Sequence, residues 1–285
     1  MSALTAALAG LIDYAGLFPP ASVDMRTAIA NYAAYAEGEH RFALGRFIVD
    51  RERLFELAAA ADPNQAMPRL SVLLAPSFQK DEVPELLANA TVESVEIKCE
   101  EPLTIMRLCE RVPDQLERYF ELSCTASCSS AIDALAAVDA RAKLRLGGVV
   151  SQAFPTAEQV ARTLHTLADR RVSFKATAGL HHPIRSVHPL NYSLDSPHET
   201  MHGFLNLLVA SAAVWHGGSV DTAQQALLEE DPGAFQFDHS ALCWRTLCFT
   251  TDQVQAVRKS FFISYGSCSF VEPLQELESL GWRIA

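Results

Sequence analysis

Short apolar runs alternate along the chain with longer segments in which apolar residues recur every three or four positions. Runs of four to eight mainly apolar residues are typical of buried strands, and the longer spacing is typical of amphipathic helices. The short runs predict eight strands: Leu11–Phe18, Leu44–Val49, Leu70–Leu74, Ser94–Cys99, Arg118–Ser123, Lys143–Leu146, Val172–Ala176 and Phe261–Tyr265.

Helical segments separate these strands and decide the fold class. DMRTAIANYAAYAEG and TAEQVARTLHTLADRR are two of them, and Thr156 with Gln159 fits a capping box at the start of the second. Eight strand–helix units within 285 residues predict an α/β protein, a single (β/α)8 TIM-type barrel over residues 1–285. An open doubly wound sheet is the alternative. Neither GxGxxG nor GxxxxGK[ST] occurs, which disfavours a dinucleotide-binding or P-loop protein.

Two segments are longer than a regular connection requires. Residues 181–195, HHPIRSVHPLNYSLD, follow the seventh strand and predict an active-site loop. A helix is then expected to begin at Ser196, with Pro197 in its first turn and Glu199 completing a capping box. Residues 217–252 predict one or two extra helices outside the barrel.

Charged residues interrupt the strands. Strands covered on both faces should be almost wholly apolar, and a charge facing the helices would be costly to bury. Alternate side chains share a face, so the charge pairs within SVEIKC and KLRLGG each point to one side, which we expect to be the barrel interior. Internal ion pairs that stabilise the barrel are the alternative explanation. The residues expected to converge on one cavity at the C-terminal mouth are Asp13, Arg46, Glu96, Lys98, Glu121, Lys143, Arg145 and Lys175.

Two lysines lie on successive strands, Lys143 in KLRLGG and Lys175 in KATAGLHH. Two ammonium groups in one cavity lower each other's pKa, and a neutral lysine can form a Schiff base with a carbonyl compound. A nearby carboxylate opposes this lowering of the lysine pKa. Whether a lysine can be neutral therefore depends on which cations Glu96 and Glu121 pair with. If these carboxylates pair with the two lysines, both lysines stay charged, and the site binds anions or carries a metal.

These motifs resemble deoxyribose-phosphate aldolases and related class I aldolase barrels. The resemblance rests on KxxxG at Lys143, KAxxG at Lys175, the acidic strand VESVEIKCEE and the turn YGSCS, about a tenth of the chain. It implies that Lys143 forms the Schiff base and that Lys175 tunes it. It also implies that the turn at Gly266 and Ser267 grips a phosphate through backbone N–H groups and a hydroxyl. Arg145 and Lys98 are charges that depart from the family pattern.

Histidines support a rival hypothesis. His181 follows the seventh strand and is a candidate general acid or base. The HETMH sequence matches HExxH, which on a helix places both imidazoles on one face for zinc. The alternative metal ligands are His181, His198, His202 and Glu96, with a divalent metal such as Zn²⁺ as the cofactor; the preferred hypothesis has no cofactor.

Composition narrows the functional class. A formal net charge of −11 argues against nucleic-acid partners, and the longest apolar stretch, Gly203–Trp215, is too short to span a membrane. No basic residue precedes Arg26, so we do not expect a secretory signal. We expect a cytoplasmic location. The seven cysteines include no CxxC pair and are expected to be free, buried thiols. Nothing in the sequence decides whether the chain forms homo-oligomers.

These patterns together predict a lyase that acts on a small anionic carbonyl or phosphorylated substrate through a lysine Schiff base. A metal-dependent lyase or hydrolase and a non-catalytic ligand-binding barrel stay open. The catalytic candidates are Lys143, Lys175, Glu96, Glu121, Asp13 and His181, and the substrate-binding candidates are Arg46, Lys98, Arg145, Thr177, Gly266 and Ser267.

Overall fold

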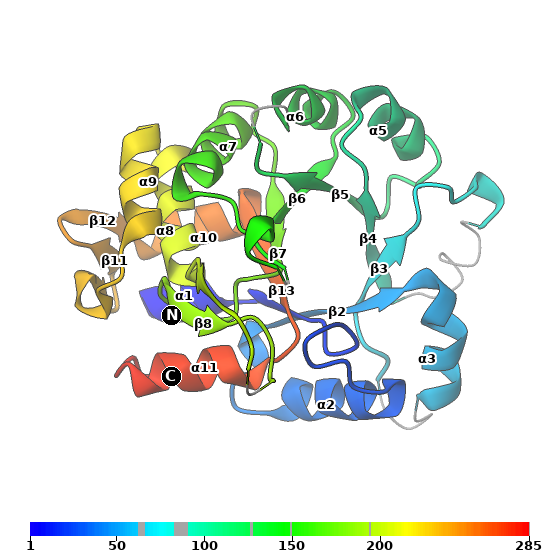
Figure 1. Cartoon of the computed structure of the whole chain (residues 1–285), viewed down its shortest axis with the longest axis horizontal. Helices are drawn as coiled ribbons and strands as arrows, with labels where there is room; N and C mark the ends of the chain where they lie inside the picture. Colours follow the sequence, from blue (N-terminus) through cyan, green and yellow to red (C-terminus); the bar gives the residue numbers. More distant parts are fainter. Residues whose placement is uncertain (62–65, 83–90, 126–127, 149, 194, 285) are drawn as a thin grey trace.

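Eight parallel strands close into a barrel in the computed structural model (Figure 1), which describes the chain except residues 62–65, 83–90, 126–127, 149, 194 and 285. The predicted (β/α)8 barrel is therefore confirmed. Around the barrel the order is β1-β13-β7-β6-β5-β4-β3-β2. The strands are β1 (Ile12–Tyr14), β2 (Leu44–Asp50), β3 (Leu70–Leu74), β4 (Val92–Lys98), β5 (Glu117–Ser123), β6 (Arg141–Arg145), β7 (Phe174–Thr177) and β13 (Phe262–Ser267).

Helices surround the strands on the outside (Figure 1). Thr156 and Gln159 form the predicted capping box at the start of α7. The apolar side chains of α8 are buried all round because this helix packs against α7, α9 and α10. The helices are α1 (Ala3–Leu8), α2 (Met25–Glu37), α3 (Leu54–Ala60), α5 (Pro102–Cys109), α6 (Cys128–Ala137), α7 (Ala157–Asp169), α8 (Phe204–Trp215), α9 (Val220–Leu228), α10 (Thr251–Ser260) and α11 (Val271–Ser279).

The segment after β7 forms a hairpin in place of the expected helix. β8 (Ser186–Pro189) and β9 (His198–Met201) pair antiparallel, with Pro189 opposite His198. The helix predicted at Ser196 is wrong, because backbone pairing with β8 holds this segment extended. The next helix begins only at Phe204, after Gly203. A Cβ at Gly203 would lie 2.4 Å from the Pro183 carbonyl oxygen, so this close approach requires glycine.

Residues 217–252 contain α9 and a small antiparallel sheet of β10 (Phe235–Phe237), β11 (Ala241–Trp244) and β12 (Leu247–Thr250). Cys243 lies opposite Cys248 in this sheet, and the two form a disulfide. The expectation that all cysteines are free thiols is therefore wrong for this pair. The free cysteines are Cys99, Cys109, Cys124, Cys128 and Cys268.

The longest and most apolar helices do not reach membrane-spanning dimensions. Among the residues that the structure describes, no helix combines the length and the apolar character that crossing a bilayer requires.

Candidate active site

A cavity of about 580 Å³ opens at the carboxyl ends of the barrel strands, the position of active sites in this fold. Its floor includes residues at or near the ends of β4, β6, β7 and β13. Residues of the segment His181–Ser193 and of β9, together called the lid, form one wall. In Figure 1 the β8 part of the lid lies beside α11, the helix that follows β13.

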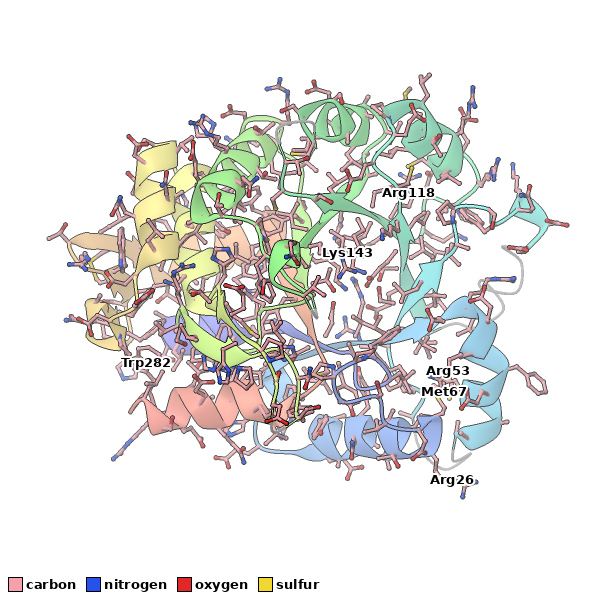
Figure 2. All side chains as sticks on the ribbon, in the orientation of Figure 1. Arg26, Arg53, Met67, Arg118, Lys143 and Trp282 are labelled. Carbon is pink, nitrogen blue, oxygen red and sulfur yellow. A yellow bond between two sulfur atoms is a disulfide. The ribbon has the colours of Figure 1, made fainter. Side chains whose placement is uncertain are left out.

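Lys143 lies inside the ring of strands (Figure 2) and lines the cavity. Its Nζ is 2.8 Å from Glu96 Oε2 and 2.9 Å from Glu121 Oε2. The other oxygen of Glu121 accepts a hydrogen bond of 2.7 Å from Arg145 Nε. The lysine amine that faces the cavity is thus held between two carboxylates, each of which could accept its proton.

Lys175 is fully buried, with 0% of its surface exposed, and lies behind the cavity wall. Its Nζ donates to Asp13 Oδ2 at 2.5 Å and to Glu96 Oε1 at 2.6 Å. Ser264 Oγ also donates to Asp13 Oδ2, at 2.7 Å. Glu96 therefore connects both lysines. The three carboxylates of the network balance its three cations.

Mutual attraction sets the pKa values of this network. Burial alone would raise the pKa of Glu96, but the ammonium groups of Lys143 and Lys175 outweigh it and hold that pKa well below its usual range. Burial would likewise lower the pKa of Lys175, but Asp13 and Glu96 raise it above its ordinary value. The carboxylates pair with both lysines, which is the arrangement that the sequence analysis assigned to anion binding or to a metal site. Schiff-base chemistry at Lys143 therefore requires that a carboxylate first takes a proton from it.

Most of the predicted site residues gather at the cavity. Asp13 and Lys175 lie one layer deeper. Arg46 lies at the opposite end of the barrel, contrary to expectation, because it is near the start of β2 and pairs with Glu93 and Glu117 at 2.9 and 2.8 Å. The predicted residues that line the cavity are Glu96, Lys98, Glu121, Lys143, Arg145, Thr177, His181 and Gly266.

The predicted Gly-Ser turn also lies at the cavity. Gly266 and Cys268 line it, whereas the Ser267 hydroxyl donates to the Ser269 carbonyl at 2.6 Å. His181 Nδ1 lies 3.1 Å from Ser267 Oγ. Burial, with smaller contributions from two neighbouring histidines, lowers the pKa of His181 to about 4, so this imidazole is neutral near pH 7. Cys268 Sγ is 3.8 Å from His181 Nδ1, but burial raises the pKa of its thiol, which disfavours a thiolate nucleophile.

The residues of the alternative metal site do not come together. His198 is exposed on β9, and His202 Nε2 is bonded to the Pro155 carbonyl at 2.8 Å. Glu96 belongs to the lysine network. HETMH does not present its histidines as a zinc helix would, because it forms strand β9 and the residue after it.

Glu272 on α11 also lines the cavity, and no motif in the sequence indicated it. Tyr192 Oη donates to Glu272 Oε1 at 3.1 Å, which attaches the lid to α11. Such a contact joins residues 80 positions apart, so no local pattern could have revealed it.

Comparison with known proteins returned no matching family model and no matching curated protein. The resemblance to aldolases therefore rests on the sequence motifs alone.

Proposed function

We propose that this protein is a lyase of the class I aldolase type that forms a Schiff base between Lys143 and a small anionic carbonyl compound. One observation carries the proposal: Lys143 lines the cavity with a carboxylate on either side, while Lys175 is sealed behind it. Lys175 holds one oxygen of Glu96 and leaves the other for Lys143. This arrangement gives the two lysines different roles.

The chemistry begins with proton transfer, because Lys143 Nζ lies between two carboxylates and must lose a proton before it can attack a carbonyl carbon. The ammonium passes one proton to Glu121 or Glu96, and the freed amine attacks the carbonyl carbon. The carbonyl oxygen takes one proton from the attacking nitrogen and one from the carboxylic acid formed in the first transfer, and it leaves as water, which produces an iminium ion. The bond between the α-carbon and the β-carbon, counted from the iminium carbon, then breaks. Its electron pair moves toward the iminium to form an enamine. A carboxylate takes the hydroxyl proton of the departing aldehyde.

The enamine regains a proton at carbon, and water hydrolyses the resulting imine to release the second product and restore the lysine. Glu96 and Glu121 are placed to move these protons. Lys98 is exposed at the cavity mouth, where an ammonium group can attract the anionic end of the substrate.

Borohydride trapping tests this proposal. The protein is incubated with small aldehydes, 2-oxo acids and sugar phosphates, then reduced and digested. The chain has five lysines, so peptide mass mapping assigns any adduct unambiguously. We expect an adduct at Lys143 that is absent from Lys143→Arg and retained in Lys259→Arg, a variant on the outer helix α10.

An adduct that survives Lys143→Arg would contradict the proposed nucleophile. If the protein binds a carbonyl compound and no adduct forms at any lysine, the lyase proposal fails. A non-catalytic ligand-binding barrel would then describe the site.

A further inference from the structure

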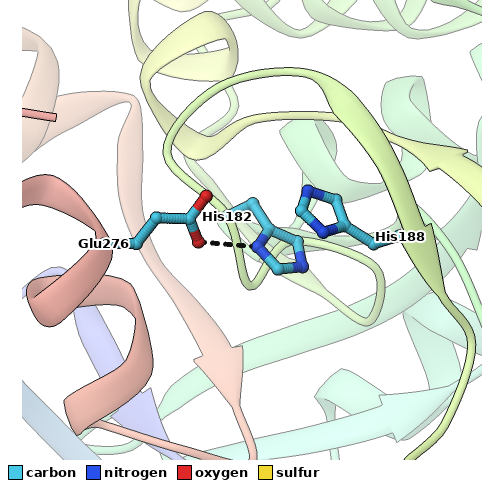
Figure 3. A group of neighbouring side chains, drawn as sticks. All are labelled: His182, His188 and Glu276. Atoms are coloured by element: carbon cyan, nitrogen blue, oxygen red, sulfur yellow. Dashed lines mark hydrogen bonds and ion pairs between the residues drawn. The ribbon is translucent and has the colours of Figure 1, made fainter. Parts of the chain in front are cut away.

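Three side chains from separate parts of the chain meet beside the cavity, which one of them, His182, also lines. Figure 3 shows the three together. They are His182, in the loop after β7, His188 on β8, and Glu276 on α11. Each offers a ligand atom, and these atoms all lie within 4.8 Å of one another. None of the three belongs to the lysine network.

The spacing of this His–His–Glu cluster is close to that of a metal site. His182 Nδ1 and Glu276 Oε2 are 2.7 Å apart. The two imidazole rings are parallel within 3°, and their centroids are 3.2 Å apart. Ligands at about 2.0–2.1 Å from a tetrahedral zinc ion lie about 3.3 Å from one another. The lone pairs of two stacked rings run parallel, so one imidazole rotates when both nitrogens bind the same ion.

A short hydrogen bond holds the ring of His188. Its Nε2 lies 2.5 Å from Ser186 Oγ, which is also 3.1 Å from the Ile184 carbonyl oxygen. Nδ1 takes no part in this bond and is the ring nitrogen left for a metal ion. A hydrogen bond that orients an imidazole in this way is typical of metal-binding histidines.

We propose that a divalent transition-metal ion, with Zn²⁺ as the first candidate, binds to His182, His188 and Glu276 and fastens the lid to α11. Two imidazoles and one carboxylate are a ligand set that zinc uses, with water in the fourth position. The ion would replace the direct contact between His182 and Glu276. The side chains of these two residues are 23% and 32% exposed, so an ion can enter from solvent.

The position of the cluster gives the ion its role. Glu276 and Glu272 are four residues apart on α11 and therefore lie on the same face. Tyr192 of the lid already bonds Glu272. A metal at Glu276 would add a second, stronger attachment between the same two elements. The proposal does not depend on Schiff-base chemistry at Lys143.

Calorimetric titration of the chelator-treated full chain with ZnCl₂ tests the site directly. We expect one ion per chain. Affinity should fall about 100-fold in His182→Ala and His188→Ala and about tenfold in Glu276→Gln. His165→Ala is the matched control, because His165 is a partly exposed histidine that also pairs with a carboxylate, Asp169, at 3.2 Å. Absence of binding by the wild type, or equal loss in His165→Ala, would overturn the proposal.

Lid cleavage provides a second measurement that does not require the histidine variants to fold. Tyr192 is 62% exposed and offers a chymotrypsin site within the lid. Zn²⁺ should slow cleavage there several-fold in the wild type and much less in Glu276→Gln, which keeps the shape of the side chain. Equal protection in both proteins, or protection in neither, would show that zinc does not fasten the lid through this cluster.

Discussion

Glu96 connects the two lysines of the site, one through each carboxylate oxygen. Its Oε1 accepts from Lys175 at 2.6 Å and from Ser71 Oγ at 2.6 Å, and its Oε2 faces Lys143 at 2.8 Å. Bonds from opposite sides restrict the rotation of this carboxylate. Lys175 therefore acts as a positioning residue, which holds the carboxylate that Lys143 would use.

Replacing Lys175 with Met should lower the free energy of unfolding by about 3–5 kcal/mol, because it removes the lysine that pairs with Asp13 and leaves that buried carboxylate uncompensated. Urea denaturation at pH 7 measures this loss. Lys259→Met, on the outer surface of α10, should change stability by less than about 0.5 kcal/mol. Equal stability of Lys175→Met and the wild type would mean that the lysine does not balance this carboxylate.

At the residue scale, period-two alternation correctly placed Glu96, Lys98, Lys143 and Arg145 at the cavity. It failed for Arg46, because alternation identifies the face of a strand and not the end at which a side chain lies. Arg46 is the third residue of β2, whereas Lys98 is the last residue of β4. Which carboxylate pairs with which lysine also stayed open, since the partners lie on different strands.

At the scale of elements, the lid and α11 together form one wall of the cavity. Replacing Tyr192 with Ala should slow imine formation with the trapped carbonyl compound about tenfold, because the lid loses its bond to Glu272 and its orientation over the site. Val187→Ala is a matched control: Val187 is also 62% exposed and on the lid, but it does not line the cavity.

Stopped-flow measurement of imine formation, with thermal unfolding of each variant, separates the two effects. Both substitutions remove exposed side chains and should leave the unfolding midpoint nearly unchanged. Equal rates in the two variants would show that closure by Tyr192 does not assist the reaction.

The sequence predicted a long segment after β7 but not its hairpin. The capping signals at Ser196 and Glu199 are local, whereas the pairing of β9 with β8 forms between residues up to 15 positions apart, Ser186 and Met201. The His182–Glu276 contact spans 94 positions, so sequence spacing carried no trace of it. Elements with local signals were therefore predicted better than contacts between elements.

For the whole molecule, the buried charges should make stability depend on pH on the acid side. The pKa of Glu96 is depressed, and so is that of Glu121, where Lys143 and Arg145 outweigh the effect of burial. A depressed carboxylate contributes its full stability above its unfolded pKa of about 4.3 and loses it as the pH falls toward the folded value. We expect the free energy of unfolding to decline steeply below about pH 4.5.

Urea unfolding from pH 7 to pH 3 measures this decline. Glu96→Gln should be less stable than the wild type at pH 7 and should lose less further stability in acid, because it has no such proton to take up. An acid decline of equal steepness in both proteins would contradict the contribution of Glu96.

Barrel closure also sets the order in which the site can form during synthesis. Asp13 on β1 bonds Ser264 on β13, which follows it by 251 positions. A ribosome adds about 5–20 residues per second, so roughly 10 to 50 s separate the appearance of these two residues. Before Lys175 and Ser264 have been synthesised, the Asp13 carboxylate bonds neither of them and is hydrated. The bond between Ser264 and Asp13 therefore forms last, when β13 enters between β7 and β1, and a nascent chain that lacks β13 has no complete site.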